Sequence, residues 1–125
     1  MHSLNKAQII GKVTRDPEIR ETKTGKKVCT IGVSTNRRWK NVDGEQKEAA
    51  EFHHVVCWGK LAELAEKFLK KGVKVFFEGR LQTRSWEDEA GQKHNRTEII
   101  AQEMLILDWN KATPKPETVL SAGDI

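Results

Sequence analysis

Only one segment of this 125-residue chain has the periodicity of an amphipathic helix, and this limits the fold more than any other feature. Within residues 60–71, apolar side chains recur at the i, i+3, i+4, i+7 spacing of one helical face: Leu61, Leu64, Ala65 and Phe68. Lys70-Lys71-Gly72 then supplies cations and a glycine suited to the end of a helix. The remaining patterned segments have the alternation of β-strands, so we expect an all-β protein with one helix.

Five segments read as strands, and they lie on both sides of the helix. They are residues 4–14, 27–35, 50–58, 73–84 and 96–108. Three strands, a helix and two strands is the element order of the OB-fold, a partly open, five-stranded Greek-key barrel with the helix between strands 3 and 4. Order alone leaves another small barrel or an α+β sheet as alternatives.

Two polar, charged segments interrupt this pattern. Residues 36–49 are expected to form a long solvent loop or a protruding hairpin, and residues 87–95 a second charged loop. Thr24-Gly25-Lys26 is a hairpin turn signal, and Asp16-Pro17 marks a turn because proline cannot donate to a strand ladder.

Composition is that of a mildly basic single domain. Lys and Arg outnumber Asp and Glu by 22 to 18, a net charge of +4. We assign residues 1–110 to the domain and 111–125 to a short flexible tail, whose own charges cancel. The basic excess permits a polyanion partner without requiring one.

The cysteines and the hydropathy pattern bear on location. Cys29 and Cys57 form no CxxC pair, which is typical of buried thiols in a reducing compartment. No stretch approaches the roughly 18 apolar residues that a membrane span needs, and the N-terminus has no apolar signal run. We expect a cytoplasmic, nucleoid-associated protein with no membrane partner.

Large aromatic side chains lie among basic residues in otherwise polar segments. Trp39 follows Arg37 and Arg38 and precedes Lys40, whereas Trp86 follows Arg84 by two positions. Flat rings beside cations suit a single nucleic acid strand, because bases stack on the rings and phosphates pair with the charges.

Strand parity relates two more aromatics to each other. Phe52, His54 and Trp58 fall on one face of their strand, and Val55 and Cys57 fall on the other. If the aliphatic face is inward, two large rings point outward together. Trp109 is expected instead to pack against the barrel or a subunit.

Signatures of catalysis are missing from the sequence. It contains no GxSxG, Walker loop, HExxH or zinc-type CxxC motif. His53 and His54 are adjacent, so in a strand they point to opposite faces and cannot share a metal. We expect a protein that is not an enzyme and that uses neither a metal nor a cofactor.

Several of these segments together resemble the bacterial-type single-stranded DNA-binding protein family, from Asn5 to about Met104. The segments are Asp16-Pro17-Glu18-Ile19-Arg20, Glu51-Phe52-His53-His54-Val55-Val56, Trp58-Gly59-Lys60-Leu61-Ala62-Glu63, Lys71-Gly72, Glu78-Gly79-Arg80-Leu81 and Thr83-Arg84-Ser85-Trp86. The resemblance implies an OB-fold assembled as a homotetramer, around which single-stranded DNA wraps.

The resemblance also implies roles for single residues. Trp39, Phe52, Trp58 and Trp86 match base-stacking positions, and His53 matches a position at the subunit interface. Lys60, Lys71 and Arg84 match positions that contact the DNA backbone, and His54 stands where an arginine is common.

The tail departs from the family pattern. Family members commonly have an acidic tip ending in Asp-Ile-Pro-Phe, whereas this chain ends in Gly123-Asp124-Ile125. Recruitment of replication and repair proteins through the tail is therefore doubtful.

The expected function is sequence-nonspecific binding and protection of single-stranded DNA in replication, recombination and repair. The alternatives are an OB-type RNA-binding module and a replisome-assembly module.

Overall fold

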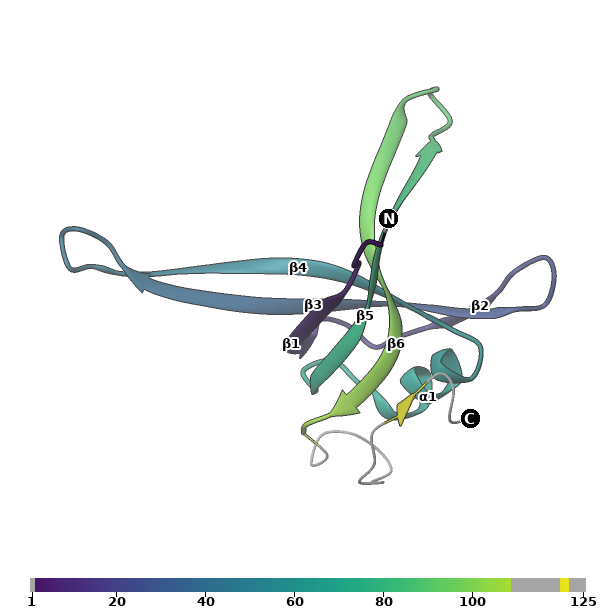
Figure 1. The fold of residues 1–125 in the computed structure, drawn as a ribbon, viewed down its shortest axis with the longest axis horizontal. Helices are drawn as coiled ribbons and strands as arrows, with labels where there is room; N and C mark the ends of the chain where they lie inside the picture. The colour runs from purple at the N-terminus through teal and green to yellow at the C-terminus, as the bar shows by residue number, and fades with distance from the viewer. Residues whose placement is uncertain (1, 109–119, 122–125) are drawn as a thin grey trace.

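Five strands close into a barrel in the computed structural model, which describes residues 2–108 and the backbone of 120–121 (Figure 1). The barrel strands are β1 (Ala7–Val13), β3 (Lys27–Lys40), β4 (Gln46–Trp58), β5 (Lys74–Glu87) and β6 (Lys93–Ile106). Two short strands lie outside the barrel: β2 (Ile19–Glu21) pairs with β3, and β7 (Leu120–Ser121) pairs with β6.

The strand pairing closes on itself. The sheet runs β1-β5-β6-β4-β3, and β3 pairs back to β1 through Lys12 with Ser34 and Val13 with Val33. All pairs are antiparallel except β4 with β6, which are parallel at Val55 with Ile99 and Val56 with Ile100. This closed barrel, with one helix between its third and fourth strands, is the OB-fold that the element order predicted.

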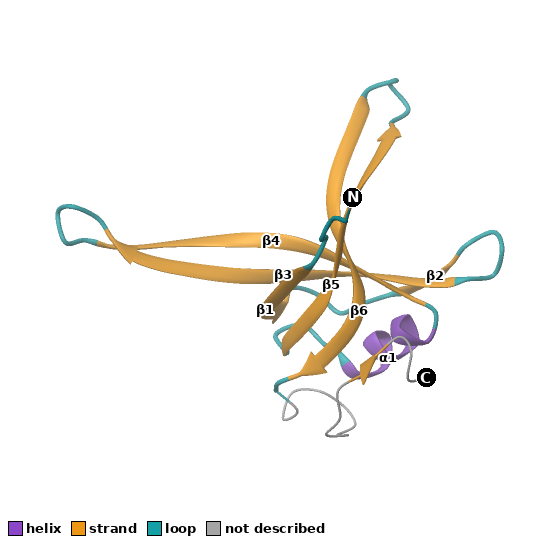
Figure 2. Ribbon diagram, in the orientation of Figure 1, coloured by secondary structure: helices purple, strands orange, loops and turns teal. Residues whose placement is uncertain are grey.

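Helix α1 (Lys60–Phe68) covers one end of the barrel, as Figure 2 shows in purple. Its apolar face is buried through Leu61, Ala62, Ala65 and Phe68. The helix ends earlier than its periodicity predicted, because Leu69 already has extended backbone. Gly72 is therefore not the helix cap. It has a φ of 91° in the following turn, where its N–H donates to the Val13 carbonyl.

The core fills the barrel with inward residues from every barrel strand. The largest fully buried side chains include Ile31, Val55, Leu61, Phe77 and Met104. Alternation along β3 and β4 explains this packing, because successive side chains point to opposite faces.

Both cysteines belong to this core. Cys29 and Cys57 are cross-strand neighbours on β3 and β4, and both are free, fully buried thiols. Burial raises the pKa of Cys29 to about 11 and that of Cys57 further still. Both thiols are therefore protonated near neutral pH.

Two glycines sit where strands approach too closely for a side chain. A Cβ on Gly11 would lie 2.2 Å from the Ser34 carbonyl oxygen, and one on Gly79 would lie 2.0 Å from that of Ile100. The ladder between β5 and β6 shifts register beside Gly79. Beyond this bulge Leu81 is exposed, although it lies an even number of positions after the buried Phe77 along β5.

The two polar segments extend the strands. The β3–β4 ladder continues to Lys40 and Gln46. Of the two expected arrangements, residues 36–49 therefore form the protruding hairpin and not the solvent loop. The second segment is not mainly a loop: β5 runs to Glu87 and β6 begins at Lys93, with only a tight turn between them. Figure 1 shows these two hairpins leaving the barrel in different directions.

Within residues 2–108 and 120–121, no helix is long and apolar enough to cross a membrane. The expectations for Trp109 and for most of the tail fall outside the described residues.

Candidate nucleic-acid interface

The outer face of β4 presents two large rings to solvent. Phe52 is 71% exposed and Trp58 is 43% exposed, whereas Val55 and Cys57 are fully buried. His54 lies between the two rings on the same face and is half-buried. Barrel closure fixes this sidedness, because a one-residue slip would put the rings inside and the aliphatic side chains outside.

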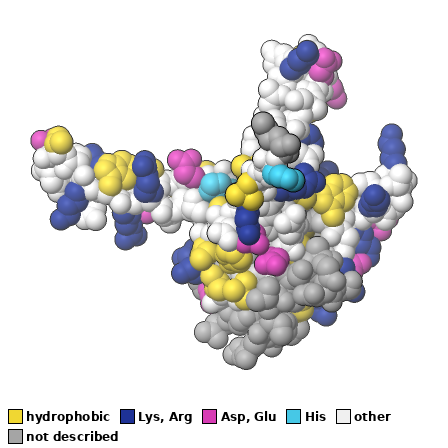
Figure 3. All heavy atoms as spheres, viewed as in Figure 1, with side chains coloured by type: hydrophobic (Ala, Val, Ile, Leu, Met, Phe, Trp, Pro, Cys, Tyr) yellow, Lys and Arg dark blue, Asp and Glu magenta, His cyan; other side chains and the backbone are white. Residues whose placement is uncertain are grey.

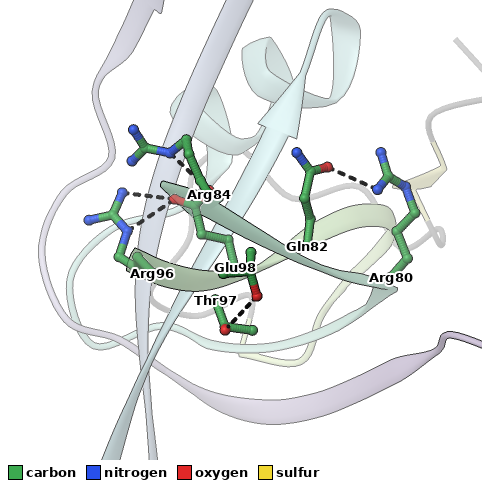
Figure 4. A network of polar contacts seen from close by, with 7 residues as sticks. Arg80, Gln82, Arg84, Arg96, Thr97 and Glu98 are labelled. Carbon is green, nitrogen blue, oxygen red and sulfur yellow. Dashed lines mark hydrogen bonds and ion pairs between the residues drawn. The ribbon is translucent and has the colours of Figure 1, made fainter. Parts of the chain in front are cut away.

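Strands β5 and β6 add arginines to the outer face, around one buried carboxylate. Glu98 is only 4% exposed. Arg96 donates to it from Nε at 3.1 Å and Nη2 at 2.8 Å, and Arg84 donates from Nε at 3.4 Å. Figure 4 shows the carboxylate between the two guanidinium groups, with Arg80 and Gln82 hydrogen-bonded farther along β5.

Ionisation of Glu98 depends on its partners. Burial alone would raise the pKa of this carboxyl, but the hydrogen bonds from Arg96 and Arg84 outweigh it and hold the pKa below its ordinary value. The buried, ionised Glu98 carboxylate thus holds Arg84 and Arg96 in position.

The same two arginines contact Trp86. The Arg84 guanidinium lies 4.6 Å from the centre of the indole and that of Arg96 lies 5.9 Å from it. The His94 ring stacks on the indole at 5.5 Å with 23° between the planes. His94 Nε2 also lies 2.7 Å from an oxygen of Asp88, a contact that lowers the pKa of Asp88. Two guanidinium groups and the His94 ring therefore surround the Trp86 indole in the folded protein.

A groove of about 550 Å³ joins these elements. Its lining includes Trp58 from β4, Arg80, Arg84 and Glu98 from β5 and β6, and Arg20 from β2. Trp58 and Arg84, chosen from sequence as a stacking residue and a phosphate contact, thus line one concavity.

Trp39 lies apart from this groove, on the β3–β4 hairpin. It lies on β3, opposite Lys47 in the ladder to β4. Its ring is 40% exposed and carries the Arg37 guanidinium 4.7 Å from its centre. Within the barrel, the odd-numbered residues of β3 and β4 point inward. Arg37 and Trp39 are odd-numbered, so they lie on the opposite face of the β3–β4 ladder from Phe52 and Trp58.

The other predicted basic contacts are dispersed. Arg38 pairs with Glu48 at 3.6 Å on the β3–β4 hairpin, and Lys40 is exposed near its tip. Lys60 pairs with Glu63 at 3.4 Å, and the backbone N–H of Lys71 donates to Asp16. Figure 3 shows Lys and Arg side chains along both the β3–β4 hairpin and the β2–β3 hairpin.

The histidines stand in different surroundings. Burial, followed by the charge of Arg96, holds the pKa of His54 below its ordinary value. His53, expected at a subunit interface, is half-buried and bonded to the Thr35 hydroxyl at 2.8 Å. Among the residues that the structure describes, no group of three or more His, Cys, Asp or Glu side chains could hold a metal ion.

Sequence reasoning missed three arginines of this surface. Arg80 could have been found from parity, because it alternates in step with Arg84 and Trp86 along β5. Arg20 and Arg96 carried no such signal, since only the pairing of β2 with β3 and the closure of the barrel bring them to this face.

Fold and surface together define a class: an OB-fold protein whose outer face and hairpins present exposed rings beside guanidinium groups. The family model described as "Single-strand binding protein family" matches residues 4–107. The chain belongs to this family.

Individual relatives agree with the family match. The single-stranded DNA-binding protein 1 of Chlorobaculum tepidum is 45% identical over 105 residues, which cover 83% of this chain and 65% of that protein. The protein of the same name from Xylella fastidiosa is 45% identical over 108 residues, covering 86% and 79%.

A solved structure is also similar. It is described as Plasmodium falciparum SSB complex with ssDNA, and it matches with a TM-score of 0.77 and 33% identity. The match covers 86% of this chain and 98% of that chain.

Proposed function

We propose that this protein binds and protects single-stranded DNA without sequence preference, in replication, recombination and repair. The observation that carries the proposal is the groove that the exposed Trp58 ring lines together with arginines from two other strands, β2 and β5. Relatives named single-stranded DNA-binding proteins and a neighbour solved with ssDNA support it. Every base has a stackable face, so stacking tolerates any sequence.

Duplex DNA would be a poor ligand for the same surface, because its base faces are already stacked on one another. The binding unit is assigned to residues 1–110, with 111–125 as a tail. The rings proposed to stack bases are Trp39, Phe52, Trp58 and Trp86, and the cations proposed to contact phosphates are Arg37, Arg38, Lys40, Lys60, Lys71 and Arg84, with His54 beside them.

Stacking alone does not account for tight binding by one subunit. Each base–aromatic stack contributes about 1–3 kcal/mol, so four rings give roughly 4–12 kcal/mol before the cost of ordering the strand. Micromolar binding already requires about 8 kcal/mol net. Phosphate contacts with counterion release, and linked sites on neighbouring subunits, must supply the rest.

Assembly into a homotetramer would provide those linked sites. A row of apolar side chains on β1, β5 and β6 supports assembly: Ile10 is 53% exposed and stands in register with Phe76, which in turn is opposite Leu105. His53 is proposed to lie at a subunit interface. The protein is proposed to act in the cytoplasm, at the nucleoid, as a binding protein without a catalytic step or a cofactor.

The direct test is tryptophan fluorescence. Adding oligo(dT) should quench emission, because three of the four tryptophans lie at or near the proposed path. Trp58→Ala and Trp39→Ala should each weaken binding by about 1–3 kcal/mol without unfolding the domain. Unchanged emission at saturating oligonucleotide would remove base stacking from the mechanism.

A parallel titration with single-stranded RNA of matched length separates the proposal from an RNA-binding module. Stacking by itself does not distinguish the two polymers. We expect tighter binding of DNA, and equal or tighter binding of RNA would favour the alternative.

A further inference from the structure

A second hollow adjoins the Trp58 groove, and arginines dominate its lining. Its volume is about 300 Å³, and it is lined by Arg15, Asp16, Glu18, Arg20, Thr30 and Arg96. Arg20 and Thr30 line both concavities, so the two lie side by side.

The three arginines come from separate parts of the chain. Arg15 lies in the segment between β1 and β2, Arg20 on β2 and Arg96 on β6. Neither Arg15 nor Arg20 forms an ion pair with any other residue that the structure describes. Guanidinium groups that form no ion pair within the protein leave their donors available to an anion from outside.

Arg96 differs because it is already oriented. It uses Nε and Nη2 to hold Glu98, and this leaves Nη1 available. The charges of Arg96 and Arg15 both depress the pKa of His54, after burial, so the two cations act on the same part of the surface.

The charge of the lining fits one phosphodiester. Three arginines against Asp16 and Glu18 leave a single net positive charge, and one Asp16 oxygen already accepts the Lys71 N–H. A phosphodiester carries one negative charge. Its oxygens match the guanidinium fork, and the Thr30 hydroxyl is one more donor.

We propose that this hollow binds one backbone phosphate of a single strand while an adjoining base stacks on Trp58. The proposal rests on the single-strand binding proposed above and adds Arg15, Arg20 and Arg96 to its contacts. The bound DNA strand would then pass through this hollow, at the junction between the barrel and β2.

The test compares variants in equilibrium binding of end-labelled oligo(dT), followed by anisotropy over a series of salt concentrations. Arg15→Ala/Arg20→Ala removes the two arginines without ion pairs, so every described ion pair stays intact. Lys12→Ala/Lys74→Ala is the matched control. It removes the same charge from a cross-strand pair of exposed lysines on β1 and β5, which do not line the hollow.

The expected result is weaker binding by the arginine variant and a shallower salt dependence. For single strands, the slope of log K against log salt becomes shallower by about 0.7 for each phosphate that the protein no longer neutralises. The lysine control should keep the wild-type slope. If the arginine variant kept the wild-type affinity and slope, phosphate binding in the hollow would be contradicted and the proposed function would stand. If the wild-type protein failed to bind oligo(dT), both the proposed function and phosphate binding in the hollow would be contradicted.

A second ligand identifies the group that is recognised. An abasic phosphodiester strand has no bases to stack, so the arginine variant should show the same decrease in slope on it. A decrease confined to oligo(dT) would mean that the arginines stack on bases, and it would overturn the assignment to phosphate.

Discussion

The two halves of strand β3 serve different parts of the molecule. Residues 28–33 alternate between the barrel interior and the outer face, and Cys29, Ile31 and Val33 are essentially inaccessible. Residues 36–40 are exposed without exception and are held by the ladder to β4. One continuous strand is therefore fixed by side-chain packing at one end and by backbone hydrogen bonds at the other.

The charged groups differ in the same way. Near the barrel, Glu98 is buried and holds two arginines against the Trp86 indole. On the β3–β4 hairpin, Arg38 with Glu48 and Lys47 with Glu45 form exposed pairs, and the Arg37 guanidinium lies over the exposed Trp39 ring. The charged side chains of the barrel surface are therefore preorganised by buried contacts, whereas those of the hairpin are held by exposed contacts.

The largest expected effect comes from replacing a phenylalanine by alanine at a buried position and at an exposed one. Phe77→Ala should destabilise the fold by about 3–5 kcal/mol, because it empties a fully buried site. Phe52→Ala, on the exposed outer face, should change the free energy of unfolding by no more than about 0.5 kcal/mol. Urea unfolding followed by circular dichroism measures both, and a decrease above about 2 kcal/mol for Phe52→Ala would show that its ring is part of the packed structure.

A second test compares two glutamates. Glu98→Ala should cost about 1.5–3 kcal/mol of stability, because it removes buried hydrogen bonds to charged groups. Glu48→Ala should cost about 0–1 kcal/mol, as expected for an exposed ion pair. Glu98→Gln keeps an acceptor and should fall between them. Equal effects at the two sites, again in urea, would contradict the preorganised barrel surface.

The smallest test uses pH. The folded protein holds the pKa of His54 below its ordinary value, so the unfolded chain takes up the proton first as pH falls. The stability that neutral His54 contributes is complete above about pH 6.5 and is lost as pH decreases through the folded-state pKa.

DNA affinity should change in the opposite direction with pH. A nearby phosphate favours the imidazolium, so affinity should rise as pH is lowered, by about tenfold for each unit by which DNA raises the pKa of His54. His54→Gln should reduce this rise in anisotropy titrations between pH 8 and 5.5. An identical pH profile for the variant would place His54 away from the strand.

Much of this architecture could be predicted from local patterns. Alternation in β4 indicated the outward positions of Phe52 and Trp58, because parity is a local property once the inward side is known. The helix was found from its apolar face, although it ends at Phe68 rather than near Lys71. Polar composition misidentified the hairpin around Trp86, because a two-stranded ribbon with both faces in water has no apolar alternation.

Non-local parts of the surface could not be predicted in this way. Glu98 resembled an ordinary strand glutamate, and its burial follows from the position of β6 between β4 and β5. Arg15, Arg20 and Arg96 meet only after the barrel closes. No window of sequence contains the pairing that brings them together.

Closure of the barrel also bears on how quickly the chain can fold. Its hairpins join neighbouring segments and can form within about 1–10 μs. The two seams that seal it, β1 with β3 and β4 with β6, each extend over only two residue pairs and connect strands that are not joined by a tight turn. Non-local pairing of this kind slows folding, because chain entropy decreases before favourable packing compensates for it. We therefore expect the seams to form last and to set the refolding rate.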